Sequence, residues 1–576
     1  MATLSTTSSA RRRRLARHGL PVAALAAVSF AIGLVIGAGH VSSEQRVVER
    51  LAAAWRKGDY VGIWATLTPE ARQRYTAAAV RQAYRSAAAT ATTRSMTIGK
   101  PRHDGDAYLL PVAVRTAAFG TVRGNVRLPL IGSGESARVD WEPDLTFPGV
   151  PRWETIHRTT ELPRRAALLA RDGTPLARGP DRGSPLGEAA RAVVGELGPP
   201  PTDRTSDLYA RGYPAEAQVG VSGLERIFEP RLAGRPGGRL FAGSRVLAST
   251  RPVEARSVRT SIDPRVQQAA ITALAGRLGG VLALRPRSGE ILAVAGIPFS
   301  GLQPPGSTFK LVTTTAVLEN GVAKPSTTFP YASSAQLSGV DLANANGESC
   351  GGTLAQAFAT SCNSVFAPLG VKLGADKLVA TARRYGFDKP APVTGAATST
   401  IPPADQIGDD LAVGASAIGQ GRVQATVLQM ASIASTIALG GRRPLLRLSV
   451  GGTPRRGPRV TSARVARQLR RMMVGVVNGG TGRNAAIPGV TVAGKTGTAE
   501  LRTTVPCKPD PANPESCPAD QQANDPTDTD AWFVGFAPAR APRVAVGVLL
   551  VRSGAGGDTA APAARDVMLA ALQRPA

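Results

Sequence analysis

The chain has 576 residues, of which 43% are apolar and 19% charged, and its formal net charge is +28. This length exceeds what one hydrophobic core usually serves, and the apolar fraction excludes a wholly disordered chain. We therefore expect two to four folded units. No basic stretch is interleaved with aromatic residues in the way typical of nucleic-acid binding, so we expect no nucleic-acid partner despite the charge.

The N-terminus carries the pattern of a membrane anchor. Residues 20–39 include no charged side chain, and about 20 such residues span a bilayer as a helix. Arginines gather before this run, so the positive-inside rule predicts a cytoplasmic tail at 1–19, a transmembrane helix at 20–40 and an extracytoplasmic remainder. A cleaved signal peptide is the alternative, but its apolar core usually has only about 7–15 residues. We expect a single-pass cell-membrane protein whose positive charge faces lipid headgroups and anionic polymers.

The four cysteines all fall in the C-terminal half. An exported chain meets oxidising conditions, so all four are disulfide candidates, and four thiols allow three pairings. Proximity in sequence favours Cys350 with Cys362 and Cys507 with Cys517, which leaves the pairing open. A reactive Cys362 is the alternative, but no histidine lies near it in sequence.

Periodicity divides the extracytoplasmic part into three regions. Residues 43–148 begin with helical spacing at 47–67 and continue with strand alternation at 107–131, which predicts a small α+β domain. Residues 149–255 are rich in Pro, Gly and Arg, with short strands and a hairpin turn at Asp172-Gly173. Residues 256–576 alternate helices and strands and predict a mixed α/β domain.

Ser307 and Lys310 are the first pair of residues that indicate chemistry. They follow Pro304-Pro305-Gly306, a helix-start signal, and precede an apolar helical stretch at 311–321. A spacing of three places the hydroxyl and the amine on one face of the first turn. A serine hydroxyl needs an adjacent base before it becomes a good nucleophile, and a lysine can be that base if burial and a second cation lower its pKa.

The distribution of histidine and lysine supports this assignment. The four histidines, at 18, 40, 103 and 157, all lie outside 256–576. This excludes a Ser-His-Asp triad or a histidine zinc site confined to that domain, and we expect no metal and no cofactor. Only 9 of the 69 basic residues are lysines, yet Lys310 and Lys495 each stand in a motif. Arginine cannot replace them, because its guanidinium does not deprotonate in proteins.

Two further motifs follow in order. Ser361-Cys362-Asn363 comes after a helical stretch, and Lys495-Thr496-Gly497-Thr498 ends an alternating strand. Glycines in that strand leave room for a second backbone, so a peptide could add to the strand edge. Lys495 would then offer positive charge to a carboxylate of the peptide.

Together, a Ser-x-x-Lys, a Ser-x-Asn and a Lys-Thr-Gly in this order resemble the motifs of penicillin-binding transpeptidases. Gly419-Gln420-Gly421 with the stretch 426–431 resembles the GQG...TPLQMA signature of that family, with Val427 where proline is common. The stretch 162–178 resembles the start of the family's dimerisation or pedestal region, and 52–75 resembles the NTF2-like domain of some class B members. The implied architecture is a penicillin-binding/serine β-lactamase-like transpeptidase domain at 256–576, preceded by an anchor, an NTF2-like domain at 43–148 and a pedestal at 149–255.

The resemblance also implies roles for individual residues. Ser307 is the nucleophile, Lys310 its base, Ser361 a proton relay and Asn363 a ligand of a substrate amide. Thr496 and Gly497 line the substrate strand. The backbone amides of Ser307 and Thr498 are expected to form the oxyanion hole, because preorganised donors stabilise developing negative charge.

The implied function is the cross-linking of peptidoglycan peptide stems by D-Ala-D-Ala transpeptidation, with β-lactams acylating the same serine. A class B protein of this kind is expected to work beside a separate glycan polymerase. Within enzymes, the alternatives are a D,D-carboxypeptidase and a β-lactam-hydrolysing enzyme. Outside enzymes, they are a β-lactam sensor and a non-catalytic scaffold of the division or elongation machinery.

Overall fold

A computed structural model describes residues 41–451, 457–500 and 529–573. The predicted anchor at 20–40 and the cysteines at 507 and 517 lie outside these ranges. Within them, no helix is both long and apolar enough to span a bilayer. The described residues divide into two compact units; the first comprises 41–163, 200–217 and 235–254, and the second comprises 164–199, 218–234 and the described residues from 255 onward.

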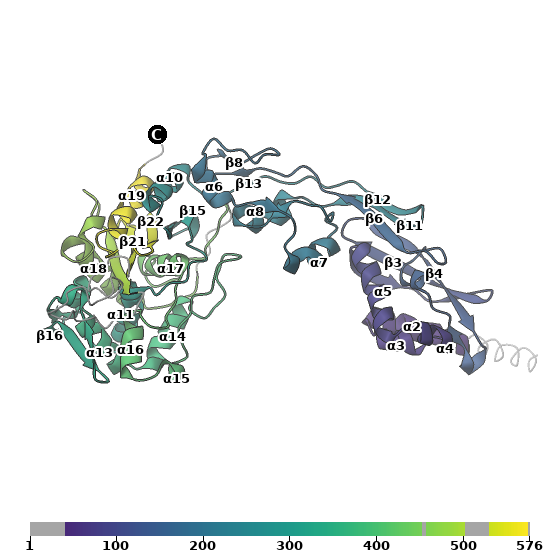
Figure 1. The fold of residues 1–576 in the computed structure, drawn as a ribbon, viewed down its shortest axis with the longest axis horizontal. Coiled ribbons are helices and arrows are strands. Elements are labelled where there is room, and N and C mark those ends of the chain that lie inside the picture. Colours follow the sequence, from purple (N-terminus) through teal and green to yellow (C-terminus); the bar gives the residue numbers. More distant parts are fainter. Residues whose placement is uncertain (1–40, 452–456, 501–528, 574–576) are drawn as a thin grey trace, which may run out of the picture. The chain divides into compact units, whose positions relative to one another are not determined.

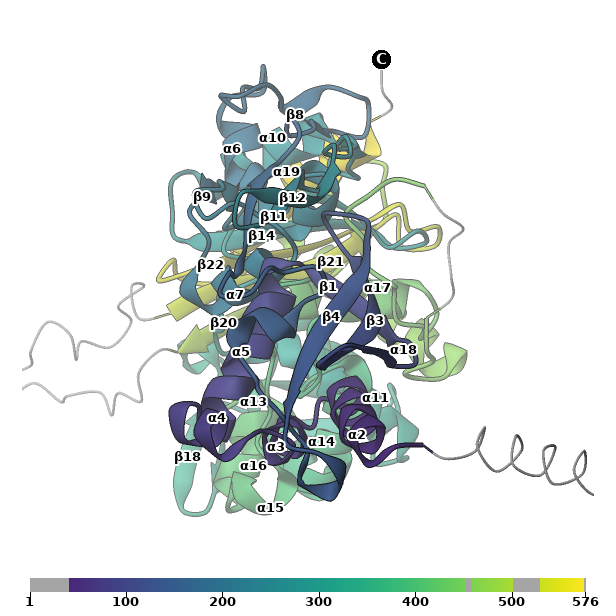
Figure 2. The ribbon, with the colours of Figure 1, turned by 90° about the vertical axis from the view of Figure 1, so that its right-hand side faces the viewer.

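The first unit begins with helices and continues with an antiparallel sheet, as the periodicity predicted (Figure 2). Its helices start at capping side chains; the Ser42 hydroxyl, for example, accepts a hydrogen bond from the Gln45 N–H. Aromatic residues fill its core, where Tyr84 packs near Trp55 and Trp141. The sheet order is β1-β3-β4-β5, and β2 pairs with β3. The elements are α2 (Ser43–Lys57), α3 (Tyr60–Ala65), α4 (Pro69–Arg74), α5 (Ala77–Thr90), β1 (Thr93–Ile98), β2 (Arg102–Asp104), β3 (Ala107–Thr116), β4 (Thr121–Ile131), η1 (Gly134–Ser136), β5 (Arg138–Val139) and η2 (Pro143–Thr146).

The segment 149–255 contributes to both units. In the first unit it forms a three-stranded sheet of order β12-β11-β6, in which Gly237 pairs with Glu161, and it adds helix α7. In the second unit, β7 and β8 form the hairpin predicted at Asp172-Gly173, and β13 pairs with β7. The elements are β6 (Ile156–Glu161), β7 (Leu168–Leu169), β8 (Pro175–Ala177), α6 (Glu188–Val194), β9 (Leu197–Gly198), α7 (Thr202–Ala210), β10 (Val219–Gly220), α8 (Gly223–Ile227), α9 (Glu229–Leu232), β11 (Gly237–Ala242), β12 (Arg245–Thr250) and β13 (Val258–Arg259).

A five-stranded antiparallel sheet of order β15-β14-β22-β21-β20 organises the second unit. Helices α10 and α19 pack on one face, and α17 packs on the other (Figure 1). Among the described strands β20 pairs with β21 alone, so it is an edge strand of this sheet. The elements are α10 (Pro264–Leu274), β14 (Gly279–Arg285), β15 (Glu290–Gly296), α17 (Val427–Ala438), α18 (Ala463–Gly479), η5 (Arg483–Ala485), β20 (Ala493–Glu500), β21 (Thr529–Ala537), β22 (Val544–Leu550) and α19 (Ala560–Leu572).

A helical region with two two-stranded sheets, β16-β19 and the hairpin β17-β18 between them in sequence, lies in the chain between β15 and α17. Its buried helix α11 follows the 3-10 turn η3, which contacts edge strand β20. Its elements are η3 (Gly306–Phe309), α11 (Lys310–Glu319), β16 (Thr328–Ala332), β17 (Ser334–Leu337), β18 (Val340–Ala343), η4 (Ala345–Gly347), β19 (Cys350–Thr353), α12 (Leu354–Ala359), α13 (Asn363–Leu373), α14 (Ala375–Tyr385), α15 (Ala404–Ile407) and α16 (Asp410–Ala417).

Candidate active site

Ser307 stands in the 3-10 turn η3, one turn before the start of helix α11 at Lys310. The Ser307 side chain is partly exposed, whereas Lys310 is fully buried. A backbone hydrogen bond supports this turn: the Gly306 N–H donates to the Gly419 carbonyl oxygen at 2.9 Å. Since the first N–H groups of a helix lack intrahelical acceptors, the Ser307 N–H belongs to the donors that a substrate oxygen could use.

Lys310 reaches the second motif. Its Nζ donates to the Ser361 carbonyl oxygen at 2.6 Å and to Asn363 Oδ1 at 2.7 Å, and it lies 3.3 Å from Ser361 Oγ. Its amine also lies 5.4 Å from the centre of the Phe366 ring. The predicted base is therefore surrounded by hydrogen-bond acceptors and an aromatic face, and no carboxylate of the described residues contacts it.

Ser361 connects the two motif lysines. Lys495 Nζ donates to Ser361 Oγ at 2.8 Å and to the Thr496 carbonyl oxygen at 3.1 Å. Ser361 adopts a φ of 64°. This left-handed conformation is uncommon for a residue with a side chain, and residues that adopt it are often found at functional sites. Its single hydroxyl thereby lies within hydrogen-bond distance of both amines, which is the arrangement that a proton relay requires.

Burial alters the protonation of both lysines. Loss of solvation lowers the pKa of Lys495 to about 7. Burial, and then the nearby charge of Lys495, lowers the pKa of Lys310 well below its ordinary value of 10.5. Both effects favour the free amine at Lys310, whereas Lys495, with a pKa of about 7, carries part of its charge at neutral pH.

The orientation of Asn363 is set by a neighbouring hairpin that the sequence did not reveal. Asn363 Nδ2 donates to the Ala343 carbonyl oxygen at 2.9 Å, so its Oδ1 faces Lys310. Asn344, which follows Ala343, is buried, and its Oδ1 accepts a hydrogen bond from the Ser364 N–H at 2.8 Å. Asn344 therefore ties the end of β18 to the start of α13. These contacts span about 20 residues and leave no local pattern in the sequence.

A disulfide joins the second motif to strand β19. It links Cys350 to Cys362, whose Cα atoms are 5.8 Å apart. Both cysteines are buried, and Cys362 is the residue between Ser361 and Asn363. The disulfide therefore anchors the loop that carries Ser361.

The third motif lies on edge strand β20. Gly497 fits closely against the η3 turn that carries Ser307, which we call the nucleophile turn. A Cβ at position 497 would lie 2.9 Å from the Pro305 carbonyl oxygen. Thr496 Oγ1 lies 2.5 Å from Thr481 Oγ1, a contact that the sequence had not assigned to the site. Thr498 Oγ1 accepts from the Gly556 N–H at 3.4 Å. Among the described strands none pairs with the other edge of β20, so that edge can receive a substrate backbone near the turn that carries Ser307.

The structure therefore brings the three predicted motifs together. A partly exposed serine precedes a buried amine of lowered pKa, a second serine joins that amine to another, and an edge strand runs alongside. This arrangement suits acyl transfer through a covalent ester on Ser307.

Comparison with known families agrees with this chemistry. Residues 279–569 match the family model of the penicillin binding protein transpeptidase domain, and residues 160–259 match that of the penicillin-binding protein dimerisation domain. The chain belongs to the class B penicillin-binding proteins. The second match includes most of the segment that the sequence predicted as a pedestal.

Two similar relatives of this penicillin-binding protein are named as peptidoglycan D,D-transpeptidases. It is 35% identical over 435 residues to the peptidoglycan D,D-transpeptidase PbpA of Mycolicibacterium smegmatis. This alignment covers 64% of this chain and 81% of the relative. The PbpA of Mycobacterium tuberculosis is 36% identical over 61% of this chain and 79% of its own.

Solved structures give the same fold. A ceftriaxone acyl-enzyme complex of penicillin-binding protein A from M. tuberculosis aligns with a TM-score of 0.56 at 30% identity, covering 71% of this chain and 99% of its own. Pseudomonas aeruginosa PBP2 in complex with WCK 5153 aligns with a TM-score of 0.60 at 27% identity, covering 73% and 97%. The mixed α/β transpeptidase fold predicted from the sequence is confirmed.

Gly419 and Gly421 of this penicillin-binding protein form a matched pair of test positions. Both have positive φ, at 77° and 66°, but a methyl group on Gly419 would overlap the Gly306 carbonyl oxygen, whereas Gly421 faces open space. Gly421→Ala should cost only about 1–2 kcal/mol of backbone strain and keep acylation. Gly419→Ala should also displace the nucleophile turn and slow acylation about 100-fold.

The measurement is the second-order rate of penicillin acylation beside the thermal unfolding midpoint of each variant. Equal acylation rates in the two variants would show that the bond from Gly306 to Gly419 does not position Ser307.

Proposed function

We propose that this protein is a peptidoglycan D,D-transpeptidase that cross-links peptide stems through an acyl-enzyme on Ser307. The observation that carries the proposal is the Ser361 hydroxyl, which lies within hydrogen-bond distance of two buried lysines next to the nucleophile turn. The transpeptidase names of its relatives and the β-lactam acyl-enzyme of M. tuberculosis penicillin-binding protein A support it.

Acylation is the first half-reaction. The neutral Lys310 amine takes the Ser307 hydroxyl proton, and Ser307 Oγ attacks the carbonyl carbon of the terminal D-Ala-D-Ala bond. The N–H groups of Ser307 and Thr498 stabilise the oxyanion. The proton passes through the Ser361 hydroxyl to the leaving amine, D-alanine departs, and an ester on Ser307 remains.

Deacylation reverses the proton path. An amine of a neighbouring stem attacks the ester carbonyl and loses one proton through the Ser361 hydroxyl to the neutral Lys310 amine, which passes it to Ser307 Oγ. The ester bond breaks, Ser307 recovers its proton, and a new amide joins the two stems. A β-lactam enters the same first step, because its strained amide presents a carbonyl to Ser307, and its ring opening leaves the same ester.

Two substrates distinguish transpeptidation from hydrolysis. The protein is given a pentapeptide stem donor with an amine acceptor stem, and the products are separated by mass. Cross-linked dimer from the wild type and none from Ser307→Ala is the expected result. Tetrapeptide without dimer at saturating acceptor would contradict transpeptidation and indicate a D,D-carboxypeptidase.

We also propose how the catalytic domain is placed in the cell. An NTF2-like domain at 43–148 fits the order of helices α2 to α5 followed by an antiparallel sheet. A single membrane anchor at 20–40 with a cytoplasmic N-terminus is favoured by the uncharged run 20–39 after the arginine cluster. The transpeptidase domain would then act outside the cytoplasmic membrane, beside a separate glycan polymerase that supplies uncross-linked strands.

A further inference from the structure

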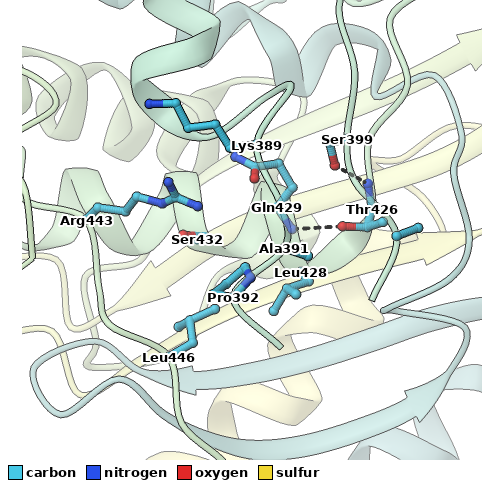
Figure 3. Close-up of a pocket in the computed structure, with 11 residues that line it drawn as sticks. Lys389, Ala391, Pro392, Ser399, Thr426, Leu428, Gln429, Ser432, Arg443 and Leu446 are labelled. Atoms are coloured by element: carbon cyan, nitrogen blue, oxygen red, sulfur yellow. Dashed lines mark hydrogen bonds between the residues drawn. The ribbon is translucent and has the colours of Figure 1, made fainter. Parts of the chain in front are cut away.

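The second unit contains a small cavity whose lining includes none of the active-site residues. It lies between helix α17, the loop after α14 and the loop after α17 (Figure 3). Its volume is about 10 Å³, close to the space of one water-sized particle. The polar groups on its wall come from Lys389, Ser399, Thr426, Gln429, Ser432 and Arg443.

Arg443 provides an uncompensated charge in this cavity. Within the described ranges, no carboxylate lies in ion-pair distance of its guanidinium, and no atom accepts a hydrogen bond from it. Burial lowers the pKa of Arg443, and no opposing charge offsets this effect. The side chain of Arg443 is partly exposed, and its five N–H donors need an acceptor that the described part of the protein does not supply.

The C-terminus of helix α14 meets only part of this need. The guanidinium lies directly against Gly386, where an added methyl group would overlap it, and a cation is favourable at a helix C-terminus. The carbonyl oxygens there already have donors: those of Ala382 and Arg383 accept from the Gly386 N–H, and that of Tyr385 accepts from Gln429 Nε2. The helix end therefore attracts the charge without accepting its hydrogen bonds.

Two other groups on the cavity wall are donors without acceptors. Figure 3 shows the Arg443 guanidinium pointing toward Ser432, with the Lys389 side chain above them. In the part of the chain that the structure describes, the Ser432 hydroxyl has no hydrogen-bond partner and Lys389 no ion pair. The nearest acidic neighbour in sequence, Asp388, is occupied by Arg383 and by the Ile401 N–H.

We propose that this cavity binds one small monovalent anion of the chloride class. The Arg443 guanidinium and the Ser432 hydroxyl donate to it, and Lys389 adds charge at the mouth. The volume of about 10 Å³ leaves no room for the four oxygens of sulfate or phosphate. The anion would join the Arg443 loop to helix α17 and to the end of helix α14. Tyr385 of α14 in turn contacts Thr315 of α11, the helix that begins at Lys310.

Thermal unfolding of the full-length chain in detergent tests the proposal. Chloride is titrated against gluconate at constant ionic strength, because gluconate is too large for the cavity. The wild type should show a saturable rise of about 2–4 °C in its unfolding midpoint. Arg443→Gln should lose this rise, and Ser432→Ala provides a second variant if Arg443→Gln does not fold.

Arg442→Gln is the matched control, because Arg442 Nη1 already donates to the Gly457 carbonyl oxygen and does not line the cavity. It should keep the chloride response of the wild type. Wild-type crystals soaked in bromide should show an anomalous peak beside Arg443 and Ser432. A chloride response that is absent from the wild type or equal in Arg443→Gln, or a cavity without a bromide peak, would overturn the proposal.

Discussion

Replacing Lys310 with arginine should slow acylation by a β-lactam about 10³-fold, within the range typical of a lost general base. Lys310 is fully buried, and burial together with the charge of Lys495 lowers its pKa, which favours the free amine. An arginine would carry its charge at every accessible pH and could not take the Ser307 proton. The acylation rate constant of each variant, measured with a fluorescent penicillin, gives the comparison.

Two further variants make the Lys310 result specific. Lys372 is an exposed lysine in the last turn of α13, so Lys372→Arg should acylate like the wild type. Lys310→Gln is neutral and smaller than arginine, so it should fold where Lys310→Arg does not, and it should be equally slow. Fast acylation in a folded Lys310→Gln would show that another group activates Ser307.

The pH profile of acylation should be bell-shaped, with its falling limb near pH 7. Lys310 must lose its proton to act as a base, so the rate rises as pH passes upward through its lowered pKa. The role proposed for Lys495, holding the carboxylate of the penicillin, requires the charged amine, so the rate should fall as pH passes its pKa of about 7. The second-order rate constant reports these groups in the free enzyme.

A charge-preserving substitution separates the two limbs. In Lys495→Arg the guanidinium stays charged above pH 7, so the falling limb should disappear while the rising limb remains. Both profiles are measured with the same carboxylate-bearing penicillin across pH 5–9, a range chosen to bracket that pKa. A wild-type rate that keeps rising to pH 9, or a falling limb that survives in Lys495→Arg, would show that Lys495 does not act through its charge.

The sequence predicted those site residues that lie in short motifs of fixed spacing. Lys310 follows Ser307 by three residues, and this spacing alone places both on one turn. Lysines are rare in a chain that uses arginine, so those at 310 and 495 pointed to a requirement for an amine. Helical spacing at 47–67 and strand alternation at 107–131 likewise predicted helices and strands there, and the structure confirms them as α2, α3, β3 and β4.

Contacts between distant segments were not predictable in this way. The Ala343 carbonyl orients Asn363 across 20 residues, and the Gly419 carbonyl supports Gly306 across more than a hundred. Neither contact depends on side-chain type at the accepting position, since a backbone oxygen accepts in both. The same reason explains why the segment 149–255 could not be divided from sequence: Gly237 pairs with Glu161 through backbone hydrogen bonds.

The most direct test of Ser307 as the nucleophile is the intact mass of the protein after exposure to penicillin, followed by peptide mapping. The wild type should gain one penicilloyl group, located on the peptide that contains Ser307, and should keep it for many minutes. Ser307→Ala with an unchanged unfolding midpoint should gain none. A penicilloyl group on another residue, or equal labelling of the folded Ser307→Ala variant, would contradict the assignment of Ser307 as the acylated residue.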